Sequence, residues 1–491
     1  MKKISFILAV LICAILAASC SDAGNIAEST SAQTTSPDTT VNASETVDSL
    51  DARRLVSDDL PDTDYGGEDF VVLYQDTMEQ DIDIFESTGD VLDDAIYARN
   101  IAVAERFNIN IKAVNGGGYE AISKTLSSVV NSGDDVYDIV MNHIIQTGSD
   151  TLKGYFYDLN EVKYIDTTKP WYPQFAVEAT TLNGRCYALV TDACFSSLWN
   201  TYTTYFNKTI AANYGIEASD IYNSVDSGKW TLDYMANLTK DVYSDLNGDG
   251  KRDINDFYGN HIHAFYSLNF LWSFDIPIVS FDENGATLEI NNDKTIKAID
   301  MAYDFIYNQK GSYAETYDEV KKSFANGNSM FLFCHFLPAM NELRDMDDDY
   351  GIVPFPKYDE AQTDYKTTID GSFDVAVIPV TVTGEKLDRA GLITEALSAE
   401  SWRTVTPVFY DTVLKVKVAR DEDSIRMIDI VMNGRVVDIS WMYAGWSGFN
   451  FVIPDLIQNN KSGADFASYY AKNETAKLKA YQDIYDFFYA D

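Results

Sequence analysis

Strand-like and helix-like segments alternate along the first part of this chain, and the alternation limits the folds open to it. Residues 69–74, 109–114 and 137–141 have the β-branched content or the alternating pattern of strands. Residues 91–107 and 119–132 have apolar residues at helical spacing and predict helices between them. Strands that alternate with helices tend to pair in parallel, so the sequence predicts an α/β fold with a largely parallel sheet.

The length of the chain predicts more than one domain or lobe. The sequence has 491 residues, which is more than a single hydrophobic core usually serves. No internal repeat stands out. The glycine cluster at 116–118 lacks the spacing of a dinucleotide-binding loop, and we interpret it as a turn.

The first twenty residues have the pattern of a secretory signal. Lys2 and Lys3 precede an apolar run at 4–16, and small residues lead into Cys20. A cysteine at this place resembles the signal of bacterial lipoproteins, which implies a lipid on Cys20 and attachment to the outer face of the membrane. Ala17 departs from that pattern, because lipoprotein signals prefer leucine three residues before the cysteine. The alternatives are a signal peptide cut nearby without a lipid, and a transmembrane anchor, for which the run is short.

After the signal peptide at 1–20, residues 21–64 predict a disordered tether. Residues 21–50 are mostly Ser, Thr, Asp, Ala and Asn, and they contain no Lys, Arg or aromatic residue. Such a segment buries too little apolar surface to offset its chain entropy. A flexible coil of about forty residues spans on the order of 35 Å, which holds a folded body clear of a lipid surface.

Charge and cysteine content argue against several classes of function. The formal net charge is −39, with 37 Lys and Arg against 76 Asp and Glu, which argues against nucleic acid and anionic lipid as partners. Cys186, Cys194 and Cys334 are too scattered for a disulfide framework, so we expect buried thiols. His261 and His263 form a close pair without a zinc signature. Aromatic residues are 13% of the chain, which suits a surface that stacks on a ligand, although most of them should fill cores.

The stretch at 245–256 has the spacing of a twelve-residue calcium-binding loop. Oxygen-bearing side chains fall at loop positions one, three, five, nine and twelve, and Gly250 sits at the tight turn. The predicted Ca²⁺ ligands are Asp245, Asn247, Asp249, Lys251 through its carbonyl, Asp253 and Asp256. Asp256 replaces the usual glutamate and no long helix clearly follows, so we expect one structural site rather than a sensor. The alternative is an acidic turn without a metal.

Short motifs lie in a definite order along residues 66–491. They include Gly154-Tyr-Phe-Tyr-Asp-Leu-Asn160, Leu182-Asn-Gly-Arg-Cys-Tyr-Ala-Leu189, Tyr205-Phe-Asn-Lys208, Gly228-Lys-Trp-Thr-Leu232, Phe324-Ala-Asn-Gly-Asn-Ser-Met330 and Tyr350-Gly-Ile-Val-Pro-Phe-Pro-Lys357. Each motif is weak alone, but in this order they resemble the extracellular solute-binding proteins of ABC importers, in the carbohydrate-type class that includes maltose-binding protein. Members from anaerobic Gram-positive bacteria often carry an Asp-rich loop like that at 245–256.

The resemblance implies a periplasmic-binding-protein-like fold of class II. In this fold two α/β lobes are joined by a hinge of several strands and close on a ligand in the cleft between them. The implied N-terminal lobe comprises residues 65–190 and 330–385, and the implied C-terminal lobe comprises residues 191–329 and 386–491.

The resemblance also implies a set of ligand-binding residues on loops at strand ends. There, aromatic rings stack on the faces of sugars and polar side chains bond their hydroxyls. The implied residues are Tyr74, Asp76, Asn142, His143, Asp192, Trp199, Trp272, His335, Asp370, Trp441, Tyr443 and Trp446. For each tryptophan the alternative is an ordinary core position, and no catalytic residue is implied.

The implied function is that of a monomeric, lipid-anchored receptor on the extracellular face of a bacterial, Gram-positive cell membrane. It would capture a sugar or oligosaccharide by lobe closure and deliver it to the permease subunits of an ABC transporter. One alternative is a surface-anchored glycoside hydrolase, which needs two carboxylates about 5–10 Å apart. Another is a binding protein for peptides or a different solute. Residues 445–449 supply no serine nucleophile, because Phe449 replaces the last glycine of that motif.

Overall fold

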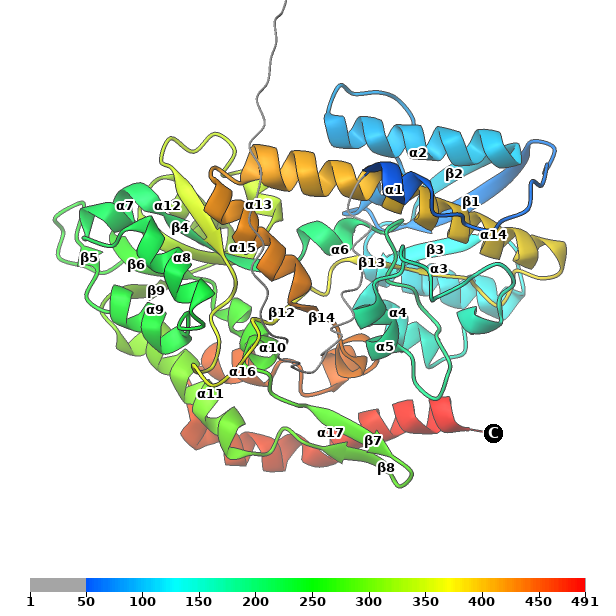
Figure 1. The fold of residues 1–491 in the computed structure, drawn as a ribbon. Helices are drawn as coiled ribbons and strands as arrows, with labels where there is room; N and C mark the ends of the chain where they lie inside the picture. Colours follow the sequence, from blue (N-terminus) through cyan, green and yellow to red (C-terminus); the bar gives the residue numbers. More distant parts are fainter. Residues whose placement is uncertain (1–49, 491) are drawn as a thin grey trace, which may run out of the picture. The chain divides into compact units, whose positions relative to one another are not determined.

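The computed structural model describes residues 50–490, which form a mixed α/β fold on two main sheets (Figure 1). The predicted signal peptide, the lipidation site Cys20 and residues 21–49 of the predicted tether lie outside the described residues. The prediction of disorder is wrong for residues 50–64, because Leu50–Arg54 form a helix and the buried Asp58 pairs with Arg106 and Arg403. Among the helices of residues 50–490, none combines the length and the apolar character that a membrane span needs.

The first sheet has four strands in the order β13-β3-β1-β2. They are β1 (Glu68–Tyr74), β2 (Ile109–Asn115), β3 (Ile139–His143) and β13 (Asp374–Val377). β1 pairs in parallel with β2 and β3, whereas β13 runs antiparallel to β3. Helices α2 (Val91–Phe107) and α3 (Tyr119–Ser132) connect the parallel strands, which confirms the predicted alternation.

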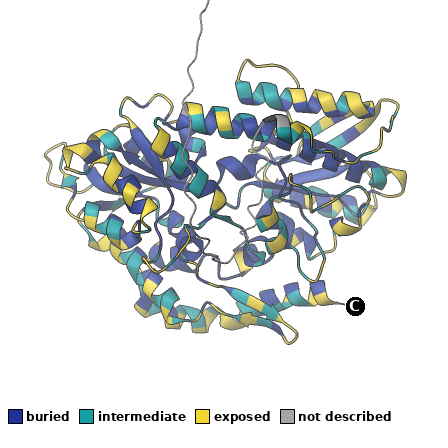
Figure 2. Cartoon of the chain, viewed as in Figure 1, coloured by how far each residue is buried: buried dark blue, intermediate teal, exposed yellow. Residues whose placement is uncertain are grey.

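The first sheet is buried on both faces along β3 and most of β1, as is typical of parallel strands, whereas the edge strand β2 is exposed at alternate residues. Along β1, Phe70 and Val72 belong to a cluster that includes residues of α2 and of α14 (Glu385–Glu400). Leu73 points to the opposite face and clusters with residues of α3. Figure 2 shows the strands of both sheets as buried and the outer helix faces as exposed.

The second sheet has the order β11-β4-β10-β6-β5, with β9 beside β6. Its strands are β4 (Tyr202–Asn207), β5 (Tyr243–Ser244), β6 (Phe257–Ile262), β9 (Ser312–Ala314), β10 (Ser329–His335) and β11 (Tyr350–Val353). β4 runs antiparallel to both of its neighbours, and β10 runs parallel to β6. Every residue of β4, β6 and β10 is buried, which places this sheet in the interior.

Shorter elements complete the described chain. The remaining α-helices are α1 (Leu50–Arg54), α4 (Ile144–Thr151), α5 (Gln174–Thr180), α6 (Ser196–Trp199), α7 (Lys208–Asn213), α8 (Ala218–Asp226), α9 (Leu232–Thr239), α10 (Phe270–Ser273), α11 (Asp293–Tyr303), α12 (Tyr317–Ala325), α13 (Leu337–Met340), α15 (Glu422–Asn433), α16 (Val452–Ile457) and α17 (Phe466–Tyr489). Strands β7 (Val279–Asp282) and β8 (Gly285–Leu288) form a hairpin, and β8 packs on α17. Strand β12 (Thr367–Thr368) pairs in parallel with β14 (Arg435–Val436). Segments η5 (Ser401–Val405), η6 (Val408–Val418) and η7 (Ser440–Ala444) are π-helical.

Two neighbouring segments carry the chain between the sheets. The first passes through α6 into β4, and the second leads from β12 back to β13. Thr201 forms a bridge with Ile369, and the N–H of Asp370 donates to the carbonyl of Asn200 at 2.8 Å. The two segments therefore run side by side, and Asp370 lies where they meet.

The two sheets contain other residues than the two predicted lobes. β10 and β11 fall almost wholly in 330–385, the range assigned to the N-terminal lobe, yet both pair with β4 in the second sheet. Most of α14 falls in 386–491, assigned to the other lobe, yet it packs on α2 beside the first sheet. Such pairing depends on contacts distant in the sequence, which the local apolar pattern of a buried strand does not encode.

Candidate functional site

Asp370 is the centre of the candidate site, at the junction of the two crossing segments. The hydroxyl of Tyr202 donates to Oδ2 of Asp370 at 2.5 Å, and the N–H of Ser372 donates to Oδ1 at 3.0 Å. The side chain of Asp370 is only partly buried. Two neutral donors therefore fix the direction of the carboxylate and leave part of it accessible.

Two buried histidines lie close enough to Asp370 to sense its charge. His143 ends β3 of the first sheet, and His335 ends β10 of the second. Burial lowers the pKa of each imidazole to about 4, although the Asp370 carboxylate opposes this shift. Both rings are therefore neutral near pH 7.

Hydrogen bonds orient the two histidine rings. Nδ1 of His143 accepts from the N–H of Ile145 at 3.2 Å at the start of α4, which leaves Nε2 as the protonated nitrogen. Nε2 of His335 lies 3.2 Å from the hydroxyl of Tyr317. The neutral rings can each offer an N–H to a ligand oxygen.

Aromatic rings line the surroundings of these histidines. Tyr119 lies 4.6 Å from His143 between ring centroids, and Trp446 lies 6.3 Å from the same ring. Trp446 stacks on Phe451 at 5.0 Å with an interplanar angle of 10°, and Phe451 in turn stacks on Phe265 at 5.8 Å. The Trp446 side chain is 54% exposed, so it presents an open aromatic surface.

We call this group the Asp370 site, and it contains buried polar atoms without a protein partner. The site comprises Asp370, Asn142, His143, Tyr202, His335 and the rings of Tyr119, Phe265, Tyr317, Trp446 and Phe451. Both amide atoms of Asn142 and Nδ1 of His335 are buried and have no hydrogen-bond partner in the protein. Buried polar atoms are rarely left unsatisfied in native proteins, so these atoms suit a polar ligand.

The structure brings part of the predicted ligand-binding set together. His143, His335, Asp370 and Trp446 are the predicted residues that ring contacts or charge interactions link in the Asp370 site, and Asn142 is included because it precedes His143 at the end of β3. Whether they contact a ligand stays a prediction.

The other predicted tryptophans and Tyr443 lie in the interior. Trp199 packs edge-to-face on Phe195 at 4.8 Å. Trp272 packs edge-to-face on Trp441 at 5.0 Å, and Trp441 in turn packs on Phe451 at 5.5 Å. The hydroxyl of Tyr443 points to the carbonyl of Thr180 at 3.5 Å. Trp441 packs on Phe451, which in turn stacks on Trp446, so Trp441 supports the aromatic surface of the site. Trp199 and Trp272 are ordinary core residues, which was the alternative for each tryptophan.

Three predicted polar residues have other surroundings. The hydroxyl of Tyr74 donates to Asp83. Asp192 is buried and accepts from Oγ1 of Thr406 at 2.8 Å, and burial raises the pKa of this carboxyl to about 6. Asp76 is exposed, just beyond the end of β1.

Several rings of the site were not predicted from the sequence. These are Tyr119, Tyr202, Phe265, Tyr317 and Phe451. A signal exists for Tyr119, because it begins a helix directly after the glycine cluster at 116–118. Tyr202 and Tyr317 depend on how the crossing segments and α12 meet β10, which no local motif reveals.

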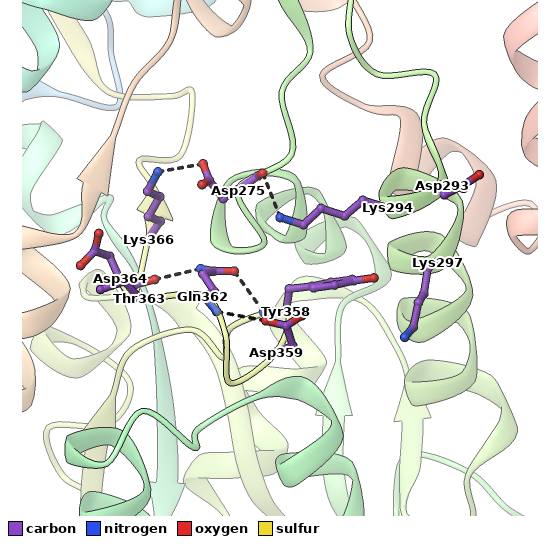
Figure 3. A pocket seen from close by; sticks show the side chains of 10 residues that line it. All are labelled: Asp275, Asp293, Lys294, Lys297, Tyr358, Asp359, Gln362, Thr363, Asp364 and Lys366. Carbon is purple, nitrogen blue, oxygen red and sulfur yellow. Dashed lines mark hydrogen bonds and ion pairs between the residues drawn. The ribbon is translucent and has the colours of Figure 1, made fainter.

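Two cavities are lined by residues outside the Asp370 site. They measure about 580 and 600 Å³ and share Asp275 and Lys366. Figure 3 shows the first, in which Nζ of Lys366 pairs with Oδ1 of Asp275 at 2.7 Å and Nζ of Lys294 donates to the carbonyl of Asp275 at 3.1 Å. Lys294 and Lys297 also lie over the ring of Tyr358 at 5.1 and 5.7 Å. The lysines of this cavity already have partners within it, whereas the Asp370 site contains buried polar atoms without a partner. We therefore place the candidate ligand site at Asp370.

The predicted calcium loop curls as expected, but its carboxylates face its own backbone. Oδ1 and Oδ2 of Asp245 accept from the N–H groups of Gly248 at 2.6 Å and Gly250 at 2.9 Å. Asp256 is buried and accepts from the hydroxyl of Tyr243 at 3.0 Å. Within residues 50–490, no three His, Cys, Asp or Glu side chains gather into a group that could hold a metal ion. The backbone fits a cation loop and the side chains do not converge, so calcium binding stays a prediction.

Comparisons with known proteins agree with the fold. A family model described as bacterial extracellular solute-binding protein matches residues 102–403. No curated protein matches the sequence of the chain.

Solved structures that resemble the chain cover most of its length. UgpB from Mycobacterium tuberculosis in complex with glycerophosphocholine has 16% identity and a TM-score of 0.54, over 86% of this chain and 99% of that one. A solute-binding protein of an ABC transporter from Thermotoga lettingae, bound with α-D-tagatose, has 12% identity and a TM-score of 0.52, over 84% and 100%. Maltose-bound MalE3 from T. maritima has 12% identity and a TM-score of 0.51, over 84% and 99%. At such low identities the likeness establishes the fold alone, and it confirms the predicted periplasmic-binding-protein-like class.

Proposed function

We propose a function from one premise: this chain belongs to the family of bacterial extracellular solute-binding proteins. The proposed function is to capture a sugar or oligosaccharide at the Asp370 site and to deliver it to the permease of an ABC transporter. Two of the three similar structures hold sugars, α-D-tagatose and maltose, which supports this ligand class, and the third holds glycerophosphocholine. The family and the similar structures are binding proteins, which favours this function over a hydrolase.

The observation that carries the proposal is the exposed ring of Trp446, whose centroid lies 6.3 Å from that of the buried ring of His143. A flat, half-exposed indole suits the apolar face of a pyranose ring. Asn142 and His335 offer unpartnered donors and acceptors, and Asp370 offers an acceptor, for the hydroxyls at the ring edge. A mostly aromatic surface with a few directed polar groups is typical of a small-molecule site.

Capture requires contacts from both sheets. Asn142 and His143 come from the end of β3, and His335 comes from the end of β10. A ligand that bonds both ends gains more contacts when the two sheets approach, so its binding shifts the protein towards a closed state. No covalent step is needed.

The same proposal includes lipid anchoring, a monomeric state and a structural calcium ion. The lipid on Cys20 and the tether would hold a monomeric receptor on the extracellular face of the membrane near its permease. A Ca²⁺ ion in the loop at 245–256 would be structural, bound by oxygens that now accept from backbone N–H groups.

A calorimetric titration of the purified protein tests the proposal. Maltose, maltotriose and cellobiose are compared with tripeptides, and we expect heat of binding only with sugars and no turnover of the bound sugar. Release of hydrolysis products, detected by chromatography, would support the hydrolase instead. Binding of tripeptides alone would contradict the sugar as ligand.

Two alanine variants localise the binding. Trp446→Ala should weaken sugar binding at an unchanged fold, because it removes the stacking surface. Tyr214→Ala is the matched control, since Tyr214 is 45% exposed and stacks on Phe257 at 5.7 Å outside the site. Equal affinities for the two variants would remove Trp446 from the ligand site.

A further inference from the structure

Asp370 has a negative charge that its surroundings leave unbalanced. Its oxygens accept from the hydroxyl of Tyr202 and from the N–H of Ser372, and both donors are neutral. None of the ion pairs described for residues 50–490 includes Asp370. A carboxylate in partly desolvated surroundings interacts strongly with any charge that arrives beside it.

The ionisable neighbours of Asp370 do not supply the missing charge. His143 and His335 are neutral near pH 7, because burial lowers the pKa of each ring to about 4. Lys321 is the lysine that influences His335, and it is already paired with Glu342 at 2.5 Å and with Asp318 at 3.4 Å. The site therefore has a net negative charge.

Two rings of the site, Trp446 and Tyr119, have no cation of the protein over them among the pairs described for residues 50–490. Within the site, Lys321 already covers the ring of Tyr317 at 3.9 Å, and elsewhere Arg53 covers Trp402 at 4.9 Å. Among the cation–π pairs described for residues 50–490, none involves Trp446 or Tyr119. The negative face of the exposed Trp446 ring is thus available to a cation from outside.

We infer that the ligand of the Asp370 site carries a cationic nitrogen, held by the carboxylate of Asp370 and by the aromatic faces around it. An amino sugar and a quaternary ammonium compound both have this chemistry. The inference rests on the proposed function. It narrows the ligand class from sugars in general to ligands that carry a positive charge, such as amino sugars. The unpartnered atoms of Asn142 and His335 then bond the polar remainder of the ligand.

The charge of the whole chain acts in the same direction. A net charge of −39 attracts cations over a long range and repels anions such as acidic sugars. A neutral sugar can donate a hydroxyl to Asp370, but it brings no positive charge to balance the carboxylate. Selectivity for a cation therefore follows from electrostatic complementarity rather than from shape.

Pairs of probes that differ in charge test this inference. Choline is compared with 3,3-dimethylbutan-1-ol, which has the same shape without the charge, and the β-1,4 dimer of glucosamine is compared with cellobiose. Calorimetric titrations at pH 6.5 should show the cationic member of at least one pair binding about tenfold more tightly, as a cation–π contact together with an ion pair predicts. The preference should shrink as salt is added, because salt screens the charge of a partly exposed carboxylate.

Two variants of the protein separate charge from geometry. Asp370→Asn removes the charge and should abolish the preference within each pair. Tyr202→Phe removes the hydroxyl that donates to Asp370 but leaves its charge, and it should retain the preference. Circular dichroism and melting curves check that both variants are folded.

The inference is overturned if no cationic probe binds more tightly than its neutral partner, or if Asp370→Asn keeps the preference. Equal binding of cellobiose and the glucosamine dimer would reject the inference and leave the proposed sugar receptor standing. Failure of every carbohydrate, in these pairs and in the neutral panel, would reject the proposed function as well. Tight binding of choline alone would support a cationic ligand and contradict the sugar.

Discussion

Ser196 donates two hydrogen bonds to the carboxylate of Asp81, from its backbone N–H to Oδ1 at 2.9 Å and from its hydroxyl to Oδ2 at 2.5 Å. The same hydroxyl accepts from the backbone N–H of Asp374 at 3.1 Å. All three residues are completely buried. Ser196 thereby joins the carboxylate of Asp81 to the backbone of Asp374, in the segment that carries the chain between the sheets.

Neither carboxyl group is balanced by a paired cation. Burial raises the pKa of Asp81 to about 7, against the hydrogen bonds of Ser196 and the attraction of Arg99. Burial, together with the neighbouring Asp81, also raises the pKa of Asp374. Arg99 is buried nearby, but its guanidinium donates to backbone carbonyls and to uncharged side chains, such as that of Ser401 at 3.0 Å.

We predict that Asp81 makes the free energy of unfolding fall as the pH rises from about 4 to about 7, whereas the lowered pKa values of His143 and His335 act in the opposite direction. A carboxyl group with a raised pKa keeps its proton in the folded state after the unfolded chain has lost it, so the folded state binds more protons in this window. The loss should be on the order of 2–4 kcal/mol, complete once the pH exceeds the folded pKa of Asp81. Urea unfolding at a series of pH values measures it.

Replacement of Asp81 isolates its share of this pH dependence. Asp81→Asn should make the free energy of unfolding less dependent on pH, because the amide has no proton to lose. Compared with the wild-type protein, the variant should therefore be more stable at pH 8 than at pH 5. Asp220→Asn is a suitable control, since Asp220 is exposed. A pH dependence unchanged by Asp81→Asn would show that other groups cause it.

Asp438 should control the aromatic support beneath Trp446. Oδ2 of Asp438 accepts from Nε1 of Trp272 at 2.7 Å, and Oδ1 accepts from the N–H of Trp441 at 2.6 Å. Asp438→Ala should lower the free energy of unfolding by about 1–3 kcal/mol, because both donors lose their partner. It should also weaken sugar binding, because Trp441 supports Trp446 through Phe451.

A double-mutant cycle gives the sharper form of that experiment. Trp272→Phe keeps an aromatic ring and removes the donor to Asp438. The effects of Asp438→Ala and Trp272→Phe on urea stability should be non-additive, because both remove the same hydrogen bond. Additive effects would mean that this bond does not stabilise the indole.

The local pattern of the sequence was sufficient for the first sheet and its helices. The predicted helices at 91–107 and 119–132 coincide with α2 and α3, because each is bounded by short signals. Asp90 caps the start of α2 by accepting from the N–H of Leu92, and Asn108 ends it in a left-handed conformation with φ of 48°. Such boundaries are set by neighbouring residues and can be predicted from them.

The candidate site could be predicted only in part. Trp441 and Trp446 were given the same role, yet one is 1% and the other 54% exposed. Trp441 lies within the π-helical segment η7 and faces inward, whereas Trp446 follows Gly445, at a φ of +36°, and faces outward. A π-helical turn changes the spacing of side chains around a helix, and its presence here depends on packing against α4 rather than on local sequence.

Calcium should stabilise the protein if the loop at 245–256 binds it. A ligand that binds only the folded state adds about 2.7 kcal/mol at one hundred times its dissociation constant. We expect a higher Tm in CaCl₂ than in EDTA, measured by calorimetry, and little effect of MgCl₂. Asp249→Asn should reduce the shift, because it removes a carboxylate while the amide oxygen still accepts from the N–H of Lys251, as Oδ1 of Asp249 does at 2.8 Å. A Tm that is the same in CaCl₂ and EDTA would favour the acidic turn without a metal.

Gly148 should be essential for joining the two sides of the Asp370 site. It lies in α4, the helix that His143 begins, and a Cβ at this position would lie 2.0 Å from the carbonyl oxygen of Met442 in η7. Gly148→Ala should therefore push α4 away from η7, lower the free energy of unfolding by about 1–3 kcal/mol and weaken ligand binding by separating His143 from Trp446. Gly118→Ala is the control, since a Cβ there meets no atom within 4 Å, and we expect it to change stability by less than about 0.5 kcal/mol. Equal stability of the two variants in urea would show that η7 moves aside without cost, and the close contact of α4 with η7 would then not determine the geometry of the site.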